Sequence, residues 1–155
     1  MQALEGIKVL DFCRNAPGMF ATTVLADLGA DVLMIERPMD ETRAAYEKLV
    51  AGIDGEDDER RHAAFNALQR NKRSLALNLK RFEAQKIFQK LAETADVVVE
   101  GFRPGVMDRL GAGYEKVRSI NPRAVYCSVS GYGQDGPYSQ MAGHDINYIS
   151  FAGAL

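Results

Sequence analysis

The fold is decided by residues 7–36, which read IKVLDFCRNAPGMFATTVLADLGADVLMIE. The stretch opens with a short β-rich run over residues 7–13, which Pro17-Gly18 ends. A helix is then predicted from Met19 to Leu28, and residues 30–36 are almost wholly apolar, as buried parallel strands are. The apolar face of the predicted helix comprises Ala21, Val24, Leu25 and Leu28. The stretch is therefore interpreted as a strand–helix–strand unit.

The same alternation continues toward the C-terminus. Further strands are predicted over residues 74–80, 96–100 and 124–130, and helices over residues 81–94, 105–110 and 114–120. Strands that alternate with helices imply parallel strands joined by right-handed crossovers. We therefore expect an α/β fold, with an open, doubly wound, mostly parallel sheet in a Rossmann-like layout.

The composition is that of an ordinary globular domain, with 155 residues, of which 46% are hydrophobic and 26% charged. The net charge of −2 gives no general attraction to nucleic acid or to anionic membranes. The start lacks the pattern of a signal peptide, and no apolar run approaches the length of a membrane span, so a cytoplasmic location is expected. Cys13 and Cys127 both fall in predicted strands, which favours reduced, buried thiols over a disulfide.

Residues 39–69 differ in character and are interpreted as a variable charged insert. They contain the charged run 56–62, in which His62 is expected at the surface. The loop after the first strand lacks the G-x-G-x-x-G spacing of a dinucleotide site. Neither the histidines nor the cysteines have metal-ligand spacing, so no metal site is predicted.

Four segments with chemically useful side chains follow predicted strands. They are residues 14–17, 36–38, 101–103 and 131–133. In open α/β sheets ligands bind beyond the carboxyl ends of the strands. We therefore expect the four segments to meet at one edge of the sheet and to form the binding site.

Near the C-terminus, residues 143–148 read GHDINY and follow the glycine-rich turn SGYGQDGP at residues 130–137. His144 is a candidate acid–base group, because the unperturbed pKa of histidine lies near neutrality. The motif is also predicted to open a helix. By itself, a His-Asp pair at such a position also fits a helix cap, with Asp145 or a neighbour bonded to backbone N–H groups.

Nine motifs in order resemble the N-terminal part of the family III CoA-transferase (CaiB/BaiF) superfamily. They are GIKVLDF (6–12), APG (16–18), ADLGADV (26–32), IERP (35–38), NKRS (71–74), NLK (78–80), EGFRPGV (100–106), SGYGQDGP (130–137) and GHDINY (143–148). Within that superfamily the chain is most similar to the α-methylacyl-CoA racemases. Those enzymes carry histidine at the position of His144, where the transferases carry an aromatic or another residue.

The resemblance implies an isomerase that moves a proton at C2 of 2-methylacyl-CoA thioesters through an enolate. His144 would act as a catalytic group beside Asp145, and N–H groups at the start of the helix would stabilise the enolate. No permanent cofactor is implied, since coenzyme A enters as part of the substrate. The acid on the opposite face and the rest of the family fold are expected beyond Leu155. An interlocked homodimer is also implied, with no nucleic acid or membrane partner.

Two other functions stay open: a CoA-transferase that moves CoA between carboxylic acids, and a non-catalytic CoA-binding fragment. By resemblance, CoA would contact residues from several predicted loops. These are Asn15, Ala16, Arg37, Leu77, Asn78, Leu79, Lys80, Gly101, Arg109, Gly143, Ile146, Asn147 and Tyr148.

Simpler roles also remain open for several charged and aromatic residues. Glu36 and Arg37 could form an ordinary charge pair, and Lys72 with Arg73 could flank a strand on its solvent side. Arg103 fits either a phosphate contact or a plain turn into a helix. The tyrosines could pack in a core or line a channel; these are Tyr132, Tyr138 and Tyr148.

Overall fold

The structure, a computed structural model, describes residues 2–38 and 67–154. One sheet contains β1 (Lys8–Asp11), β2 (Asp31–Glu36), β3 (Lys72–Ala76), β4 (Val97–Glu100) and β5 (Val125–Ser128). The helices are α1 (Ala16–Asp27), α4 (Phe82–Ala92), α5 (Val106–Arg109), α6 (Tyr114–Ile120) and α7 (Asp145–Phe151).

The sheet has the strand order β3-β2-β1-β4-β5, and every adjacent pair is parallel. This order confirms the predicted doubly wound α/β sheet. The chain runs outward from β1 to β3 and then returns to place β4 on the other side of β1. The direction of winding therefore reverses between β1 and β4, and crevices for ligands form at such a reversal, beyond the carboxyl ends of the strands.

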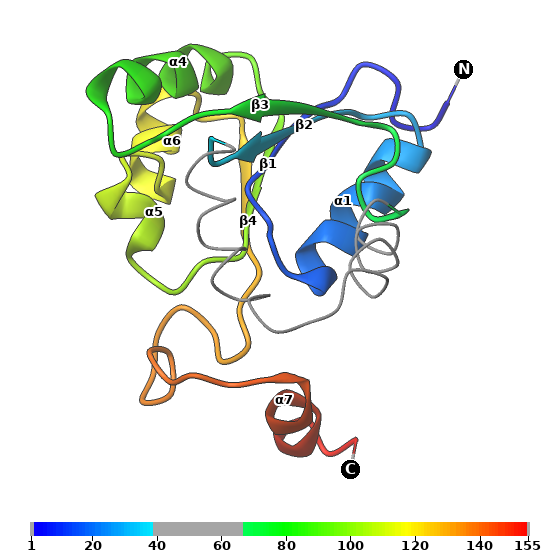
Figure 1. The fold of residues 1–155 in the computed structure, drawn as a ribbon, viewed down its shortest axis with the longest axis vertical. Helices are drawn as coiled ribbons and strands as arrows, with labels where there is room; N and C mark the ends of the chain where they lie inside the picture. The colour runs from blue at the N-terminus through cyan, green and yellow to red at the C-terminus, as the bar shows by residue number, and fades with distance from the viewer. Residues whose placement is uncertain (1, 39–66, 155) are drawn as a thin grey trace, which may run out of the picture.

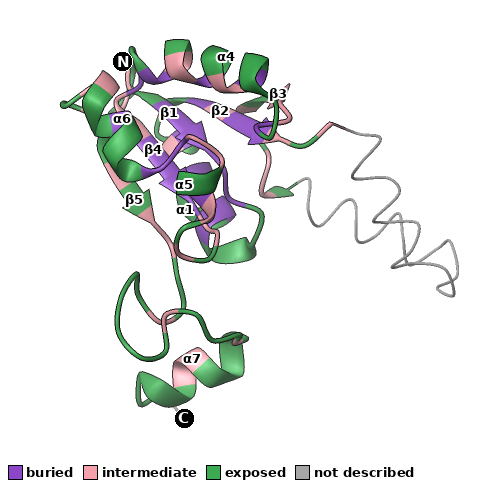
Figure 2. Cartoon of the chain, turned by 90° about the vertical axis from the view of Figure 1, so that its left-hand side faces the viewer, coloured by how far each residue is buried: buried purple, intermediate pink, exposed green. Residues whose placement is uncertain are grey.

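Helices cover both faces of the sheet (Figure 1). On one face, α4, α5 and α6 bury a core that includes Phe88, Val98 and Val117. On the other face, α1 covers a smaller core that includes Val9 and Val32. Figure 2 shows that buried residues concentrate in the sheet and in the helix faces turned toward it. The two apolar faces of the strands explain why the strand sequences are almost continuously hydrophobic.

Helix α1 differs from the prediction in its start and in its buried face. It begins at Ala16, with Pro17 in the first turn, where a missing N–H costs nothing. Most of the predicted apolar face is wrong, because Val24 and Leu28 are 38% and 45% exposed, although Leu25 does pack against the core. Thr22 and Thr23 are fully buried instead. The Thr22 hydroxyl donates to Asp11 Oδ2 at 2.6 Å, and the Thr23 hydroxyl donates to the Met19 carbonyl of its own helix at 2.7 Å. The buried face can therefore be polar without unsatisfied groups.

Strand β3 also differs, since it spans Lys72–Ala76 rather than residues 74–80. It pairs with β2 as far as Glu36, where β2 ends, and the Leu77 N–H still donates to the Glu36 carbonyl at 2.8 Å. Beyond that point no neighbouring strand remains, so residues 77–80 leave the sheet as a loop at its carboxyl edge.

Two further expectations concern cysteines and the insert. Cys13 is a buried free thiol as expected, but Cys127 is exposed, because its side of β5 is not covered by the described residues. His62 and most of the insert lie outside the described residues.

None of the helices in residues 2–38 and 67–154 has the length and apolar character needed to cross a bilayer.

Residues 130–154 form a C-terminal segment that ends in α7 and lies beyond the carboxyl edge of the sheet (Figure 1). The segment contains no buried residue. Its helix is held by an aromatic cluster made of Tyr132, Tyr138, Tyr148 and Phe151, whose neighbouring ring centroids lie 5.0 to 6.0 Å apart. The C-terminal segment is therefore a peripheral unit without a core of its own.

Candidate functional site

A cavity of about 230 Å³ opens at the carboxyl edge of the sheet, where β1, β2, β3 and β4 end. We call it the edge pocket. Its walls come from the loops after these strands and from α5. The lining residues are Phe12, Arg14, Ile35, Glu36, Arg37, Leu77, Asn78, Leu79, Lys80, Phe102, Val106, Arg109 and Leu110.

The polar part of the edge pocket is strongly cationic. Arg14, Arg37, Lys80 and Arg109 line it, against a single carboxylate, Glu36. No side chain of these four cations forms an ion pair or a hydrogen bond with another described residue. The interpretation of Glu36 and Arg37 as a charge pair is not supported, because the Glu36 carboxylate accepts a hydrogen bond from the Ser74 hydroxyl.

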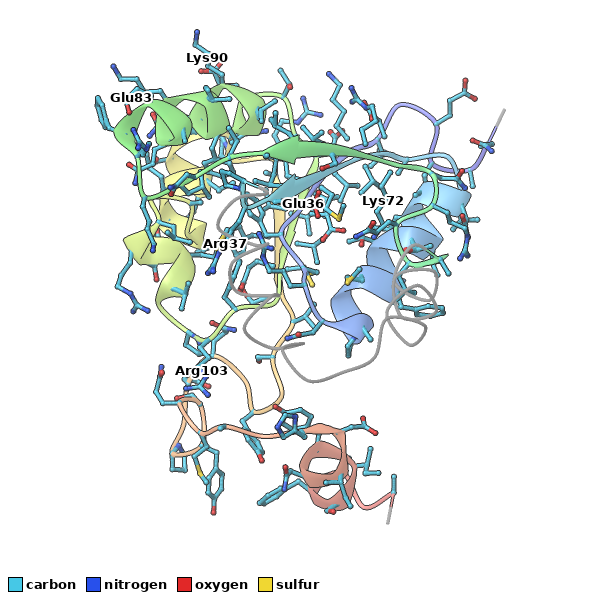
Figure 3. All side chains as sticks on the ribbon, viewed as in Figure 1. Glu36, Arg37, Lys72, Glu83, Lys90 and Arg103 are labelled. Atoms are coloured by element: carbon cyan, nitrogen blue, oxygen red, sulfur yellow. The ribbon has the colours of Figure 1, made fainter. Side chains whose placement is uncertain are left out.

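Electrostatics at Arg14 reflect this crowding of positive charge. Partial burial of its guanidinium lowers the pKa of Arg14, the nearby Arg37 lowers it further, and Glu36 acts in the opposite direction. An anion in the pocket would favour all of the cationic forms at once. The pocket is therefore suited to a ligand with negative charge, and Figure 3 shows Arg37 between the sheet and α5.

The loop after β3 places Lys80 by a turn of its own. The Asn78 side-chain oxygen accepts the Lys80 N–H at 3.1 Å, and the Arg81 N–H donates to the Asn78 carbonyl at 2.9 Å. Asparagine favours such turns because its side chain can bond to backbone N–H groups two residues on. The local sequence therefore brings Lys80 back over the end of the sheet.

Most of the other residues that line the edge pocket are apolar. Phe12 packs edge-on against Phe88, with ring centroids 5.5 Å apart, and is buried. Phe102 is half-buried, and its N–H donates to the Glu100 carboxylate at 2.7 Å. A pocket lined by both cationic and apolar side chains fits a ligand that has phosphate groups and an apolar portion.

The structure brings together six of the residues that the resemblance implicates in CoA binding. Arg37, Leu77, Asn78, Leu79, Lys80 and Arg109 all line the edge pocket. Seven others do not line it: Asn15, Ala16, Gly101, Gly143, Ile146, Asn147 and Tyr148. The resemblance does not implicate Arg14, but its place directly beyond the first strand puts it in one of the four segments expected at the site.

Of the four strand-end segments, three contribute to the edge pocket and one does not. Residues 131–133 lie in the C-terminal segment instead. Arg103 is exposed and does not line the pocket, and its carbonyl accepts the Val106 N–H at 3.1 Å. This geometry supports the interpretation of Arg103 as part of a turn into α5.

His144 stands at the N-cap of α7, as the motif predicts, and is exposed. Its N–H donates to the Asn147 side-chain oxygen at 2.9 Å, and its carbonyl accepts the Asn147 N–H at 2.9 Å. Asn147 rather than Asp145 therefore caps the helix. The His144 N–H is consequently not available to an enolate, whereas the N–H groups of Asp145 and Ile146 have no partner in the described residues.

The tyrosines around the motif pack against one another rather than in the main core. Tyr132 contacts Tyr148 edge-on with ring centroids 5.0 Å apart. The Tyr148 hydroxyl donates to the Gly143 carbonyl at 2.6 Å. A Cβ at Gly131 would lie 2.0 Å from Tyr148 Cε1, so only glycine leaves room for this ring. These contacts fix the position of residues 143–148 against the glycine-rich turn.

Lys72 and Arg73 differ in burial, although the sequence allows both to lie on the solvent side of the strand. The Arg73 side chain is 67% exposed and pairs with Asp31 at 2.6 Å. The Lys72 side chain is fully buried and pairs with Asp11 at 3.1 Å, so the solvent-side interpretation is wrong for Lys72. Figure 3 shows Lys72 directed toward α1.

Within residues 2–38 and 67–154, no three His, Cys, Asp or Glu side chains gather closely enough to hold a metal ion. The two buried carboxylates at the strand ends, Asp11 and Glu100, instead accept hydrogen bonds from the backbone.

Comparison with known proteins connects this geometry to a family. The model of CoA-transferase family III matches residues 4–155. The chain is 42% identical to succinyl-CoA:glutarate CoA-transferase of Homo sapiens, over 100% of this chain and 34% of that protein. It is 40% identical to alpha-methylacyl-CoA racemase of Mus musculus, over 98% of this chain and 34% of that protein.

Comparison with solved structures leads to the same family. A CAIB/BAIF family protein from Brucella suis superposes with a TM-score of 0.79 at 35% identity, covering 98% of this chain and 39% of that chain. The chain thus spans about a third of the length of the curated relatives that it matches.

Proposed function

The chain belongs to CoA-transferase family III, and from that premise we propose that it contributes the CoA-binding part of an acyl-CoA racemase. In the proposed reaction, a proton is removed from and returned to C2 of a 2-methylacyl-CoA thioester through an enolate. The observation that carries the proposal is the edge pocket, in which four cations lack an anionic partner among the described residues.

Coenzyme A matches the charge of the edge pocket, because it carries a diphosphate and a 3′-phosphate. Arginine guanidinium groups bind phosphate oxygens in a bidentate manner, and lysine binds them as a point charge. Arg14, Arg37 and Arg109 would serve in the first way and Lys80 in the second. The four cations would otherwise repel one another, so phosphate binding removes an unfavourable interaction as well as adding a favourable one.

The size of the edge pocket indicates which part of the ligand it holds. Sites that enclose a whole drug-sized ligand have volumes of about 300–1,000 Å³. At about 230 Å³, the edge pocket is smaller and fits only a portion of an acyl-CoA. The phosphates would lie at the cations, with the adenine or the start of the pantetheine against Phe102 and Val106. The thioester would then lie outside the pocket.

His144 would supply one acid–base group to the thioester. The α-proton of a thioester is far less acidic than imidazolium, so the enolate must be stabilised as it forms. The unpartnered N–H groups of Asp145 and Ile146, at the start of α7, are candidate donors for that purpose. Racemisation needs a second group on the opposite face of the planar enolate, which we expect outside residues 1–155. An interlocked homodimer remains a prediction of the family resemblance.

A CoA-transferase is the second candidate, and a specific observation favours it. The relative at 42% identity is named for transfer of CoA between succinyl-CoA and glutarate. Both candidates require the same CoA contacts. They differ in the bond that changes, since the racemase breaks a C–H bond at C2 and the transferase breaks the thioester bond.

Deuterium exchange separates the two candidates. The complete natural polypeptide is incubated in deuterated water with 2-methylacyl-CoA, with and without a free dicarboxylate acceptor, and the products are analysed by mass spectrometry. We expect deuterium at C2 without an acceptor. If CoA passes to the acceptor while C2 keeps its hydrogen, the proposed racemase is wrong and the transferase is correct.

The His144→Ala variant tests the role of the motif. We expect exchange to fall by about 10²- to 10⁴-fold, the usual contribution of a general acid–base group, and to fall more in one stereochemical direction than in the other. The matched control is Ser150→Ala on the same helix, whose hydroxyl, among the described residues, bonds to the Ile146 carbonyl and to no other group. An equal and mild loss in both directions would count against a direct role for His144.

A further inference from the structure

A buried ionic network lies between the sheet and α1, and the proposed reaction does not use it. Lys72 Nζ in β3 lies 3.1 Å from Asp11 Oδ2 in β1, and neither side chain has any exposed surface. Lys72 Nζ also donates to the Thr22 hydroxyl at 2.7 Å and to the Met19 carbonyl at 3.0 Å. The Thr22 hydroxyl lies 2.6 Å from Asp11 Oδ2. The network therefore connects β1, β3 and α1.

Stability alone is a weak explanation for such a network. Removing two charges from water is costly, and replacing a buried ion pair with apolar residues of similar volume is often neutral or stabilising. The network lies between the sheet and α1, beside an apolar cluster, so apolar side chains could fill its place. A polar network at this place is better explained by its directional hydrogen bonds, which can hold a neighbouring backbone group in one position.

The second oxygen of Asp11 makes such a directional hydrogen bond to the backbone. Asp11 Oδ1 accepts the Cys13 N–H at 2.8 Å, just where β1 leaves the sheet. We call this hydrogen bond the Asp11 clasp. It fixes the backbone one residue before Arg14, which is a cation of the edge pocket. While Lys72 and Thr22 hold one oxygen of the carboxylate, the other holds the loop.

The neighbouring strand has the same arrangement. Glu100 ends β4, is 4% exposed, and accepts the Phe102 N–H at 2.7 Å through Oε2. Phe102 also lines the edge pocket. Both strands at the reversal of winding thus use a buried carboxylate to bond the N–H two residues on. In both cases the bonded segment forms a wall of the pocket.

We propose that Asp11, held by Lys72 and Thr22, is a positioning residue that fixes the loop carrying Arg14 at the edge pocket. This inference rests on the proposed binding of CoA there. Asp11 does not touch the ligand, and its effect on binding passes through Arg14.

Two double variants of the complete natural polypeptide isolate the Asp11 clasp from the buried charge. Both remove the charges and keep the site filled. Asp11→Asn/Lys72→Met retains an oxygen that can accept the Cys13 N–H, whereas Asp11→Leu/Lys72→Met has none. We expect the first variant to bind CoA within about twofold of the parent. The second should bind about tenfold more weakly, a factor equivalent to about 1.4 kcal/mol. Asp11→Ala/Lys72→Met replaces the second variant if that one does not fold.

Adding Arg14→Ala to each background tests the route of the effect, with CoA affinity measured by calorimetry. In the parent and in Asp11→Asn/Lys72→Met, this substitution should weaken CoA binding about tenfold. In the variant without the clasp it should cost less than about twofold, because coupled residues are not additive. Equal losses in all backgrounds would overturn the proposal, as would equal CoA affinity of the two double variants.

A readout without ligand keeps the outcome separate from the proposed function. Amide exchange of the peptide covering residues 12–19 is measured by mass spectrometry. Exchange should be faster in Asp11→Leu/Lys72→Met than in Asp11→Asn/Lys72→Met. The two variants should unfold at the same denaturant midpoint, so that the difference in exchange is local. If the parent does not bind CoA, the proposed function fails, while exchange still decides whether the clasp holds the loop. Equal exchange in the two variants would overturn the positioning role.

Discussion

The sheet and the C-terminal segment of this protein are built in opposite ways. The sheet is closed on both faces by helices, and its strand ends hold the edge pocket on buried supports such as Phe12 and Asp11. The C-terminal segment carries the motif with His144 but contains no buried residue and is held by its aromatic cluster. Gln140 reaches from it to the Pro104 carbonyl over a long hydrogen bond of 3.5 Å.

This difference separates binding from chemistry. A pocket on strand ends is rigid because each lining residue follows a strand whose position the sheet determines. A motif on a peripheral helix depends on whatever packs against that helix. We therefore expect substitutions in the sheet to change stability and CoA affinity, and substitutions in the C-terminal segment to change proton exchange alone.

The largest expected effect is on the buried charges of the sheet. Lys72→Ala should lower the free energy of unfolding by about 3–5 kcal/mol, because it leaves the Asp11 carboxylate buried without its cation. Denaturant unfolding of the complete natural polypeptide measures the change. Arg73→Ala is the matched control, since its exposed ion pair with Asp31 is worth about 0–1 kcal/mol. Similar losses for the two variants would contradict the burial of Lys72.

Next in size is the effect of the pocket cations on CoA affinity. Arg37→Ala and Lys80→Ala should each weaken CoA binding by about 10- to 100-fold, as expected for hydrogen bonds to charged groups. The losses should shrink as salt is added, because exposed charges are screened. Titration calorimetry at two salt concentrations measures both effects. Arg103→Ala, outside the pocket, should bind CoA as the parent does, and a loss there would show that the site is wider than the edge pocket.

A smaller effect is expected when the C-terminal segment is displaced. Gly131→Ala places a Cβ 2.0 Å from the ring of Tyr148, so the ring and the start of α7 must move. Proton exchange at C2 should fall by about tenfold, because catalytic groups depend strongly on position. CoA affinity should stay within about twofold of the parent. If affinity falls in step with exchange, the two regions act as one site and the separation is wrong.

The smallest effect concerns one hydrogen bond within the C-terminal segment. Tyr148→Phe removes the donor to the Gly143 carbonyl and should cost about 1 kcal/mol locally. Amide exchange of residues 143–151 should therefore speed up several-fold, while the unfolding midpoint of the sheet does not change. Tyr138→Phe is the control, since that hydroxyl has no partner in the described residues. Equal exchange in both variants would remove Tyr148 as the anchor.

Much of the fold could be predicted because its signals are local. Apolar runs and the punctuation of Pro17-Gly18 indicated strands and helices, and α6 has the predicted bounds of 114–120. Helix faces were harder to predict. Hydrophobicity alone predicts the wrong face for α1, because the Asp11 carboxylate and the Met19 carbonyl accept the hydroxyl hydrogen bonds of the buried Thr22 and Thr23.

The sequence by itself determined the order of strands and helices, their parallel arrangement and the N-cap position of His144, since these follow from neighbouring residues. Only the tertiary structure decided that Lys72 is buried against Asp11, although the two lie 61 positions apart. It also decided that Arg14, Arg37, Lys80 and Arg109 share one pocket while the His144 motif lies on a separate unit. The physical reason is that burial and charge depend on which distant segments meet, which local patterns do not specify.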